Sequence, residues 1–92
     1  MTEDFLEFLT NTTEQLLPHI KRIRPPIYWH MRASLQACQK YRDYVAARDL
    51  AEFHLYLIEQ DIKALTEKGD KEGVRCRREI KQDILEGIGE QQ

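Results

Sequence analysis

The residues best suited to chemistry lie in one acid-free stretch, His19 to Arg32, which reads HIKRIRPPIYWHMR. It holds four Lys or Arg side chains together with a tyrosine and a tryptophan, in a chain whose formal net charge is −2. Arginine binds phosphate through a planar fork of N–H donors, and a flat aromatic ring offers a surface on which a base or sugar can stack. This combination indicates contact with a nucleic-acid backbone.

The positive charge extends beyond this stretch. From Gln15 to Arg42 there are six Lys or Arg and no Asp or Glu, while the other residues include eight basic and sixteen acidic side chains, a net charge of −8. A weaker basic cluster spans Lys68 to Lys81. The predicted backbone contacts are Lys21, Arg22, Arg24, Arg32, Lys40, Arg75 and Arg78, with Tyr28 and Trp29 as stacking or interface residues.

Three other interpretations of these residues remain open from the sequence. Tyr28 and Trp29 could close one end of the hydrophobic core. The arginines could pair with carboxylates elsewhere in the chain, or they could face an acidic protein surface.

Nothing in the sequence predicts an enzyme. There is no glycine-rich phosphate loop, no nucleophile elbow and no paired-histidine metal motif. We expect the three histidines, His19, His30 and His54, to be surface or half-buried residues. We expect Cys38 and Cys76 to be buried free thiols. The sequence therefore predicts no catalytic residue, no metal and no cofactor.

The length of 92 residues predicts a single domain covering 1–92. No apolar run approaches the roughly 20 residues of a membrane-spanning helix, and the first residues, MTEDFLEF, are acidic where a signal peptide would be basic. We therefore expect a cytoplasmic protein without membrane contact. Because so short a chain buries only about 60–65% of its unfolded surface, part of its stability is expected to come from a partner.

Apolar residues recur at spacings of three and four in every segment, which predicts helices over 3–23, 26–46, 49–68 and 71–88. Thr2 is the expected N-cap of the first, the Pro25–Pro26 pair ends it, and Gly69 followed by Asp70 separates the last two. The fold class is all-α, a compact bundle of four helices. A fifth helix would result if Thr12 and Gln15 formed a capping box.

The boundary near residues 46–50 is the least determined one. Tyr41 and Val45 continue the apolar stripe of the second helix, whereas Leu50 begins a stripe on a shifted face. Either one bent helix or two helices with Asp49 as N-cap would explain the shift. Two helices are favoured, because a single helix of about 43 residues would be about 64 Å long.

A helical chain of about this size, with a basic face and no active-site motif, resembles the small subunits of type I CRISPR effector (Cascade-type) complexes. The resemblance implies a non-enzymatic accessory subunit of an antiviral ribonucleoprotein complex, docked on other protein subunits and present in one or several copies. Basic residues would hold DNA or RNA backbone and so stabilise a guide–target duplex or a displaced strand. The net negative charge implies that it binds nucleic acid only when docked. The alternative is a small helical inhibitor or adaptor that binds one protein partner.

Overall fold

The computed structural model describes residues 2–89 and consists of four helices. They are α1 (Glu3–Ile23), α2 (Pro25–Tyr41), α3 (Tyr44–Lys68) and α4 (Lys71–Gly89). Residues 2–89 contain no strand, so the prediction of an all-α bundle of four helices is confirmed. Within the same residues, no helix is both long and apolar enough to span a bilayer.

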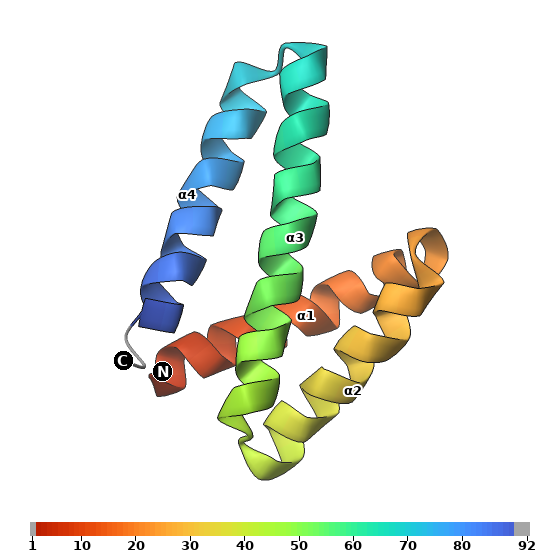
Figure 1. Cartoon of the computed structure of the whole chain (residues 1–92), viewed down its shortest axis with the longest axis vertical. Coiled ribbons are helices and arrows are strands. Elements are labelled where there is room, and N and C mark those ends of the chain that lie inside the picture. The colour runs from red at the N-terminus through yellow and green to blue at the C-terminus, as the bar shows by residue number, and fades with distance from the viewer. Residues whose placement is uncertain (1, 90–92) are drawn as a thin grey trace.

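The helices form two antiparallel pairs that cross (Figure 1). α1 packs chiefly on α2, and α4 packs chiefly on α3. In Figure 1, α1 passes behind the first half of α3. The molecule measures 42 × 31 × 16 Å along its principal axes. Since packed helices lie about 8–10 Å apart, the shortest dimension holds no more than two helix layers.

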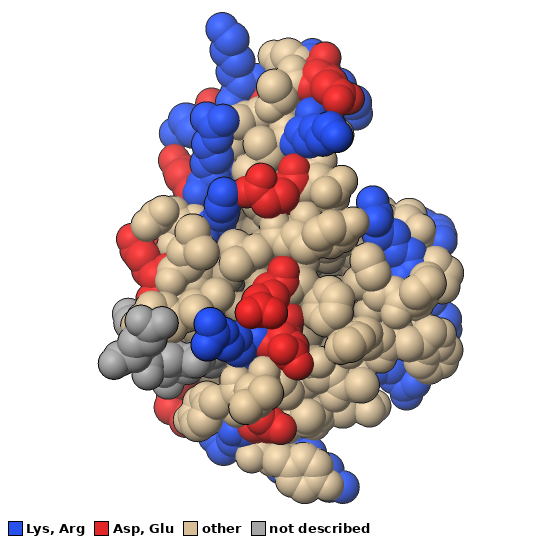
Figure 2. Space-filling model, viewed as in Figure 1, with Lys and Arg blue, Asp and Glu red and all other residues tan. Residues whose placement is uncertain are grey.

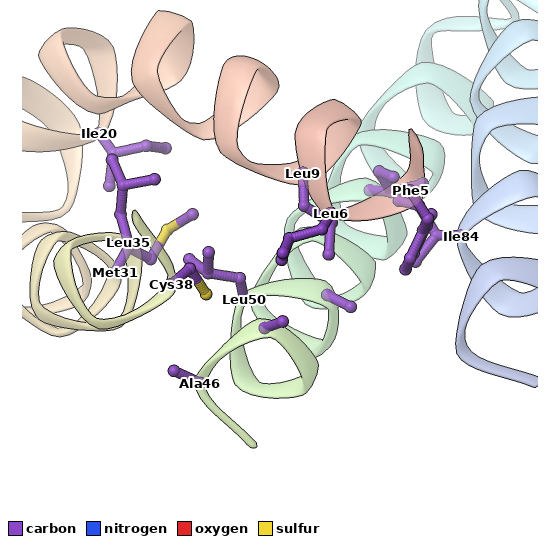
Figure 3. Close-up of a cluster of buried hydrophobic side chains, with 13 residues drawn as sticks. Phe5, Leu6, Leu9, Ile20, Met31, Leu35, Cys38, Ala46, Leu50 and Ile84 are labelled. Atoms are coloured by element: carbon purple, nitrogen blue, oxygen red, sulfur yellow. The ribbon is translucent and has the colours of Figure 1, made fainter. Parts of the chain in front are cut away.

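The hydrophobic core lies where α1, α2 and the first half of α3 meet, and α4 adds Ile84 to it (Figure 3). From Glu59 to Asp83 no residue is buried, so the far half of the α3–α4 pair adds little to this core. Thirteen buried side chains form the core: Phe5, Leu6, Leu9, Ile20, Met31, Leu35, Cys38, Ala46, Ala47, Leu50, Ala51, Ile58 and Ile84.

Local chemistry explains where most of the helices begin and end. The Thr2 hydroxyl accepts a hydrogen bond from the Phe5 N–H at 3.1 Å, which caps α1. Gly69 ends α3 with a φ of 77°, a left-handed conformation that glycine adopts without strain. The Asp70 carboxylate then accepts from the Gly73 N–H at 2.9 Å and caps α4. These three sequence predictions are confirmed.

Helix α1 is continuous through the polar run that could have started a fifth helix. Thr13 is buried at the position between Leu9 and Leu16 where the apolar stripe lacks an apolar residue. Its hydroxyl donates to the Leu9 carbonyl at 2.7 Å, which satisfies the buried polar group within the helix. The capping box of Thr12 and Gln15 does not form, because both residues lie inside α1.

The turn between α2 and α3 lies earlier than the sequence predicted. Arg42 adopts a left-handed conformation with a φ of 52°, and the Asp43 carboxylate accepts from the N–H groups of Val45 and Ala46 at 2.9 and 3.2 Å. The predicted ranges 26–46 and 49–68, with Asp49 as N-cap, are therefore corrected to Pro25–Tyr41 and Tyr44–Lys68. Tyr41 and Val45 are 69% and 74% exposed, because this turn takes both away from the core face of α2.

Candidate nucleic-acid interface

Five of the predicted cations lie along the outer side of α1 and α2, and we call this surface the α1–α2 edge. The last turn of α1 supplies two of them, the prolines place the third at the turn, and the outer stripe of α2 supplies the other two. Figure 2 shows Lys and Arg without Asp or Glu beside them along the right-hand side of the molecule, where Figure 1 places α2 and the α1–α2 turn. The five cations are Lys21, Arg22, Arg24, Arg32 and Lys40.

None of these five cations forms an ion pair with a carboxylate within residues 2–89. The ion pairs of the described residues use other cations: Arg42, Arg48, Arg75, Arg77 and Lys81. Of the interpretations left open by the sequence, pairing of these five cations with carboxylates elsewhere in the chain is therefore excluded for the described residues. The positive charge of the edge is not balanced by carboxylates of the described residues.

Aromatic rings, and one histidine, contact the five cations instead. Arg22 Nη2 donates to His19 Nδ1 at 3.1 Å, and Arg24 Nη1 donates to the Tyr56 hydroxyl at 3.4 Å. A ring face orients a cation through its quadrupole but does not neutralise it. Four cation–ring pairs occur, Lys21 over Tyr28 at 5.5 Å, Arg24 over Tyr56 at 5.8 Å, Arg32 over Trp29 at 5.6 Å and Lys40 over Tyr41 at 5.2 Å from the ring centre.

The two aromatic residues of the opening stretch have different surroundings. Trp29 is 58% exposed, so it is not a core residue. Tyr28 is half-buried and packs against the core cluster. The two rings meet edge to face, with centres 5.0 Å apart and planes inclined by 73°, so that Tyr28 supports the Trp29 ring from the core side.

The structure does not bring all seven predicted cations together. Arg75 and Arg78 lie in the first turns of α4, next to the α3–α4 turn and away from the α1–α2 turn (Figure 1). Arg75 pairs there with Glu72 and, at 3.3 Å, with Glu79. The carboxylates of Glu72 and Glu79 compete with any phosphate at Arg75. Arg78 has no such partner within residues 2–89, but its place on α4 also keeps it out of the edge. Lys40 belongs to the edge but lies at the opposite end of α2 from Arg24.

One histidine is buried, contrary to the sequence prediction. His54 is 4% exposed, and its Nε2 lies 2.8 Å from the Thr13 hydroxyl. Because that hydroxyl already donates to the Leu9 carbonyl, His54 Nε2–H must be the donor. Burial lowers the pKa of His54 to about 4, so the ring is neutral at pH 7. His19 and His30 are exposed.

The cysteines and acidic groups form no reactive centre among residues 2–89. Cys38 is buried and Cys76 is half-buried, and both are free thiols. Burial, helped by the charges of Asp43 and Asp49, raises the pKa of Cys38 to about 11, which keeps the thiol protonated and unreactive. No group of three His, Cys, Asp or Glu in the described residues is placed to hold a metal ion.

A second surface feature is an apolar groove between α1, α3 and α4, with a volume of about 310 Å³. Its walls include three exposed apolar side chains, Phe8, Ile23 and Ile80. At one end Arg77 Nε pairs with the Asp61 carboxylate at 3.4 Å. Exposed apolar side chains gathered around a groove are typical of a surface that binds an apolar part of another molecule.

Comparison with known proteins gave no match to a family model, to a curated protein or to a solved structure. Function is therefore inferred from the two surfaces themselves.

Proposed function

We propose that this chain is a non-enzymatic accessory subunit of a nucleoprotein complex, and that its α1–α2 edge holds the backbone of a nucleic acid. The observation that supports the proposal is the set of five cations without a carboxylate partner in the described residues, four of them over aromatic rings. A cation held over a ring keeps its charge and loses little side-chain freedom when a phosphate arrives.

The mode of contact follows from the types of residue at the edge. Lys and Arg on a helix surface bind phosphates and release counterions, which positions the strand without reading its sequence. Pro25 and Pro26 fix the turn between the helices, so little entropy is lost there on binding. Since the rest of the chain has a net charge of −8, the free subunit repels nucleic acid and binds it weakly. Other subunits of the complex would supply the remaining affinity.

The experiment compares charge reversals at the edge with a matched reversal elsewhere. Arg22→Glu, Arg24→Glu and Arg32→Glu are made singly and together, and Lys63→Glu on α3 is the control with the same change in charge. The complex that co-purifies with tagged protein is tested for nucleic-acid binding over a range of salt. Each lost phosphate contact should reduce the log–log salt slope by about 0.7–0.9, and the control should leave it unchanged.

A second candidate function is that of a small adaptor or inhibitor that binds one protein partner. The apolar groove favours it, because exposed Phe8, Ile23 and Ile80 suit a protein contact better than a phosphate backbone. The same purification separates the two functions. If a partner stays bound after nuclease treatment, and the edge variants lose that partner without changing any salt slope, the adaptor function is correct and the nucleic-acid function is wrong.

A further inference from the structure

We infer that Trp29 is a stacking platform for an unpaired base, and that the nucleic acid held by the α1–α2 edge is single-stranded. The inference rests on the proposed function, since it names the form of nucleic acid that the same edge would take. It depends on the placement of rings and cations along α2, in addition to the total charge.

The first step concerns the exposure of Trp29. Trp29 is 58% exposed, although other residues of α2 are buried in the core. Tyr28 contacts it edge to face at 5.0 Å, and the Arg32 guanidinium lies 5.6 Å from its centre. A phosphate bound to Arg32 would therefore place the adjacent base next to the Trp29 ring. Stacking of that base would cover apolar surface that the fold leaves in water.

The second step concerns a repeat of this arrangement on the same helix. At the end of α2, Tyr41 is 69% exposed and Lys40 Nζ lies 5.2 Å from the centre of its ring. The twelve residues from Trp29 to Tyr41 rise by about 18 Å, which is about five nucleotides at 3.4 Å each. Between the rings, Arg32 and Gln36 are exposed on the outer side of the helix. A ring near each end of this length, with two cations between the rings, suits a single strand with exposed bases.

The third step compares a double helix with a single strand as the ligand of the α1–α2 edge, and the single strand fits the exposed rings better. In a duplex the base faces stack on one another, and the grooves present only base edges. A duplex could use the cations but would leave the exposed surfaces of Trp29 and Tyr41 in water. The rival arrangement lays α2 in a major groove, where Arg32 and Gln36 would read base edges. The two arrangements predict different behaviour of Trp29.

The test uses the full chain at high protein concentration and low salt, where phosphate contacts are strongest, so that the weak binding expected of the free subunit is measurable. Trp29 is the only tryptophan of the sequence, so intrinsic fluorescence reports this one ring. The probes are oligodeoxythymidylate and oligouridylate of about twelve nucleotides and a DNA duplex of equal length, a size suited to single-strand sites. We expect both single strands to quench Trp29 and the duplex to leave it unchanged.

Affinity is measured in parallel by the anisotropy of labelled probes. Trp29→Ala should weaken single-strand binding about 5- to 150-fold, the range for one stacked base, and change duplex binding less than about twofold. Trp29→Phe should restore part of the affinity, since it keeps a ring. Tyr44→Ala, an exposed tyrosine at the start of α3, is the control and should have no effect. Circular dichroism checks that each variant is folded.

The outcomes separate this inference from the proposed function. Salt-dependent binding without quenching, or duplex binding at least as tight as single-strand binding, overturns the single-strand inference and leaves the proposed function standing. Absence of salt-dependent binding to all three probes, in the free chain and in the purified complex, overturns both.

Discussion

The residue with the most perturbed chemistry is His54, which plays no part in the α1–α2 edge. It is buried on α3, and its one side-chain hydrogen bond in the described structure joins Nε2 to the Thr13 hydroxyl of α1 at 2.8 Å. A neutral imidazole satisfies this arrangement, whereas an imidazolium would place an unpaired charge in the core. Burial therefore lowers the pKa of His54 to about 4 from its ordinary value of 6.5.

This pKa makes the stability of the protein depend on pH. Below pH 6.5 the unfolded state binds a proton at His54 and the folded state does not, so stability is complete above pH 6.5 and is lost as the pH falls toward 4. The contribution of His54 should fall by about 2 kcal/mol between pH 7 and pH 5. Urea unfolding at the two pH values measures the change.

Two variants test whether His54 is the source of that change. His54→Gln removes the titrating group and keeps an N–H donor for Thr13, so it should flatten the pH dependence between pH 7 and pH 5. His30→Gln changes an exposed histidine and should keep the wild-type dependence. Equal pH dependence in the wild type and His54→Gln would contradict the assignment.

The sequence identified the cations that form the edge but could not predict which side chains they contact. The absence of acids from Gln15 to Arg42 excluded local ion pairs, yet pairing with distant carboxylates depended on the tertiary structure. Arg77 on α4 illustrates this, since its partner Asp61 lies sixteen residues earlier on α3. Burial of His54 did have a signal, because it lies four residues after Leu50 and four before Ile58, both buried.

At the scale of elements, two of the three turns between helices have a signal in the sequence and one does not. Proline and glycine mark two of the three turns, and the structure has them where predicted. The third turn has a left-handed arginine at Arg42, a conformation that non-glycine residues adopt only rarely and that no sequence pattern announces. The sequence also contains Arg-Asp twice, at 42–43 and at 48–49, and only the first of these aspartates caps a helix.

The identity of this cap gives a second prediction. Asp43→Ala removes the acceptor of the Val45 and Ala46 N–H groups and should lower the free energy of unfolding by about 1 kcal/mol. Asp43→Asn keeps an acceptor and should lower it less. Asp49→Ala, inside α3, is the matched control and should change it by less than about 0.5 kcal/mol. Chemical denaturation measures all three, and a larger loss for Asp49→Ala than for Asp43→Ala would contradict the observed boundary.

At the scale of the whole molecule, buried contacts and charge are both distributed unevenly. The buried side chains gather where α1, α2 and the first half of α3 meet, whereas no residue from Glu59 to Asp83 is buried. The far half of the α3–α4 pair therefore buries little apolar surface to offset the conformational entropy that its two helical segments lose on folding. The α1–α2 edge, in contrast, is built directly on the core, so its cations and rings are held on the more stable part of the molecule.

This unevenness predicts that the chain opens in two steps. Amide hydrogens from about residue 62 to residue 80 should exchange through local opening of the α3–α4 tip, at a lower free energy than those of α1 and α2. Native-state hydrogen exchange measures the difference. Gly69→Ala places a side chain at a φ of 77° and should lower protection in the tip by about 1 kcal/mol.

The matched variant acts on the other part of the molecule. Leu50→Ala removes a fully buried side chain and should lower the protection of α1 and α2 by about 2–5 kcal/mol, while tip amides that exchange by local opening change less. Equal loss of protection throughout the chain in both variants would mean that the four helices unfold as one cooperative unit. In that case the α1–α2 edge would have no greater stability than the tip, and its rings and cations would be no better ordered than Arg75 and Arg78.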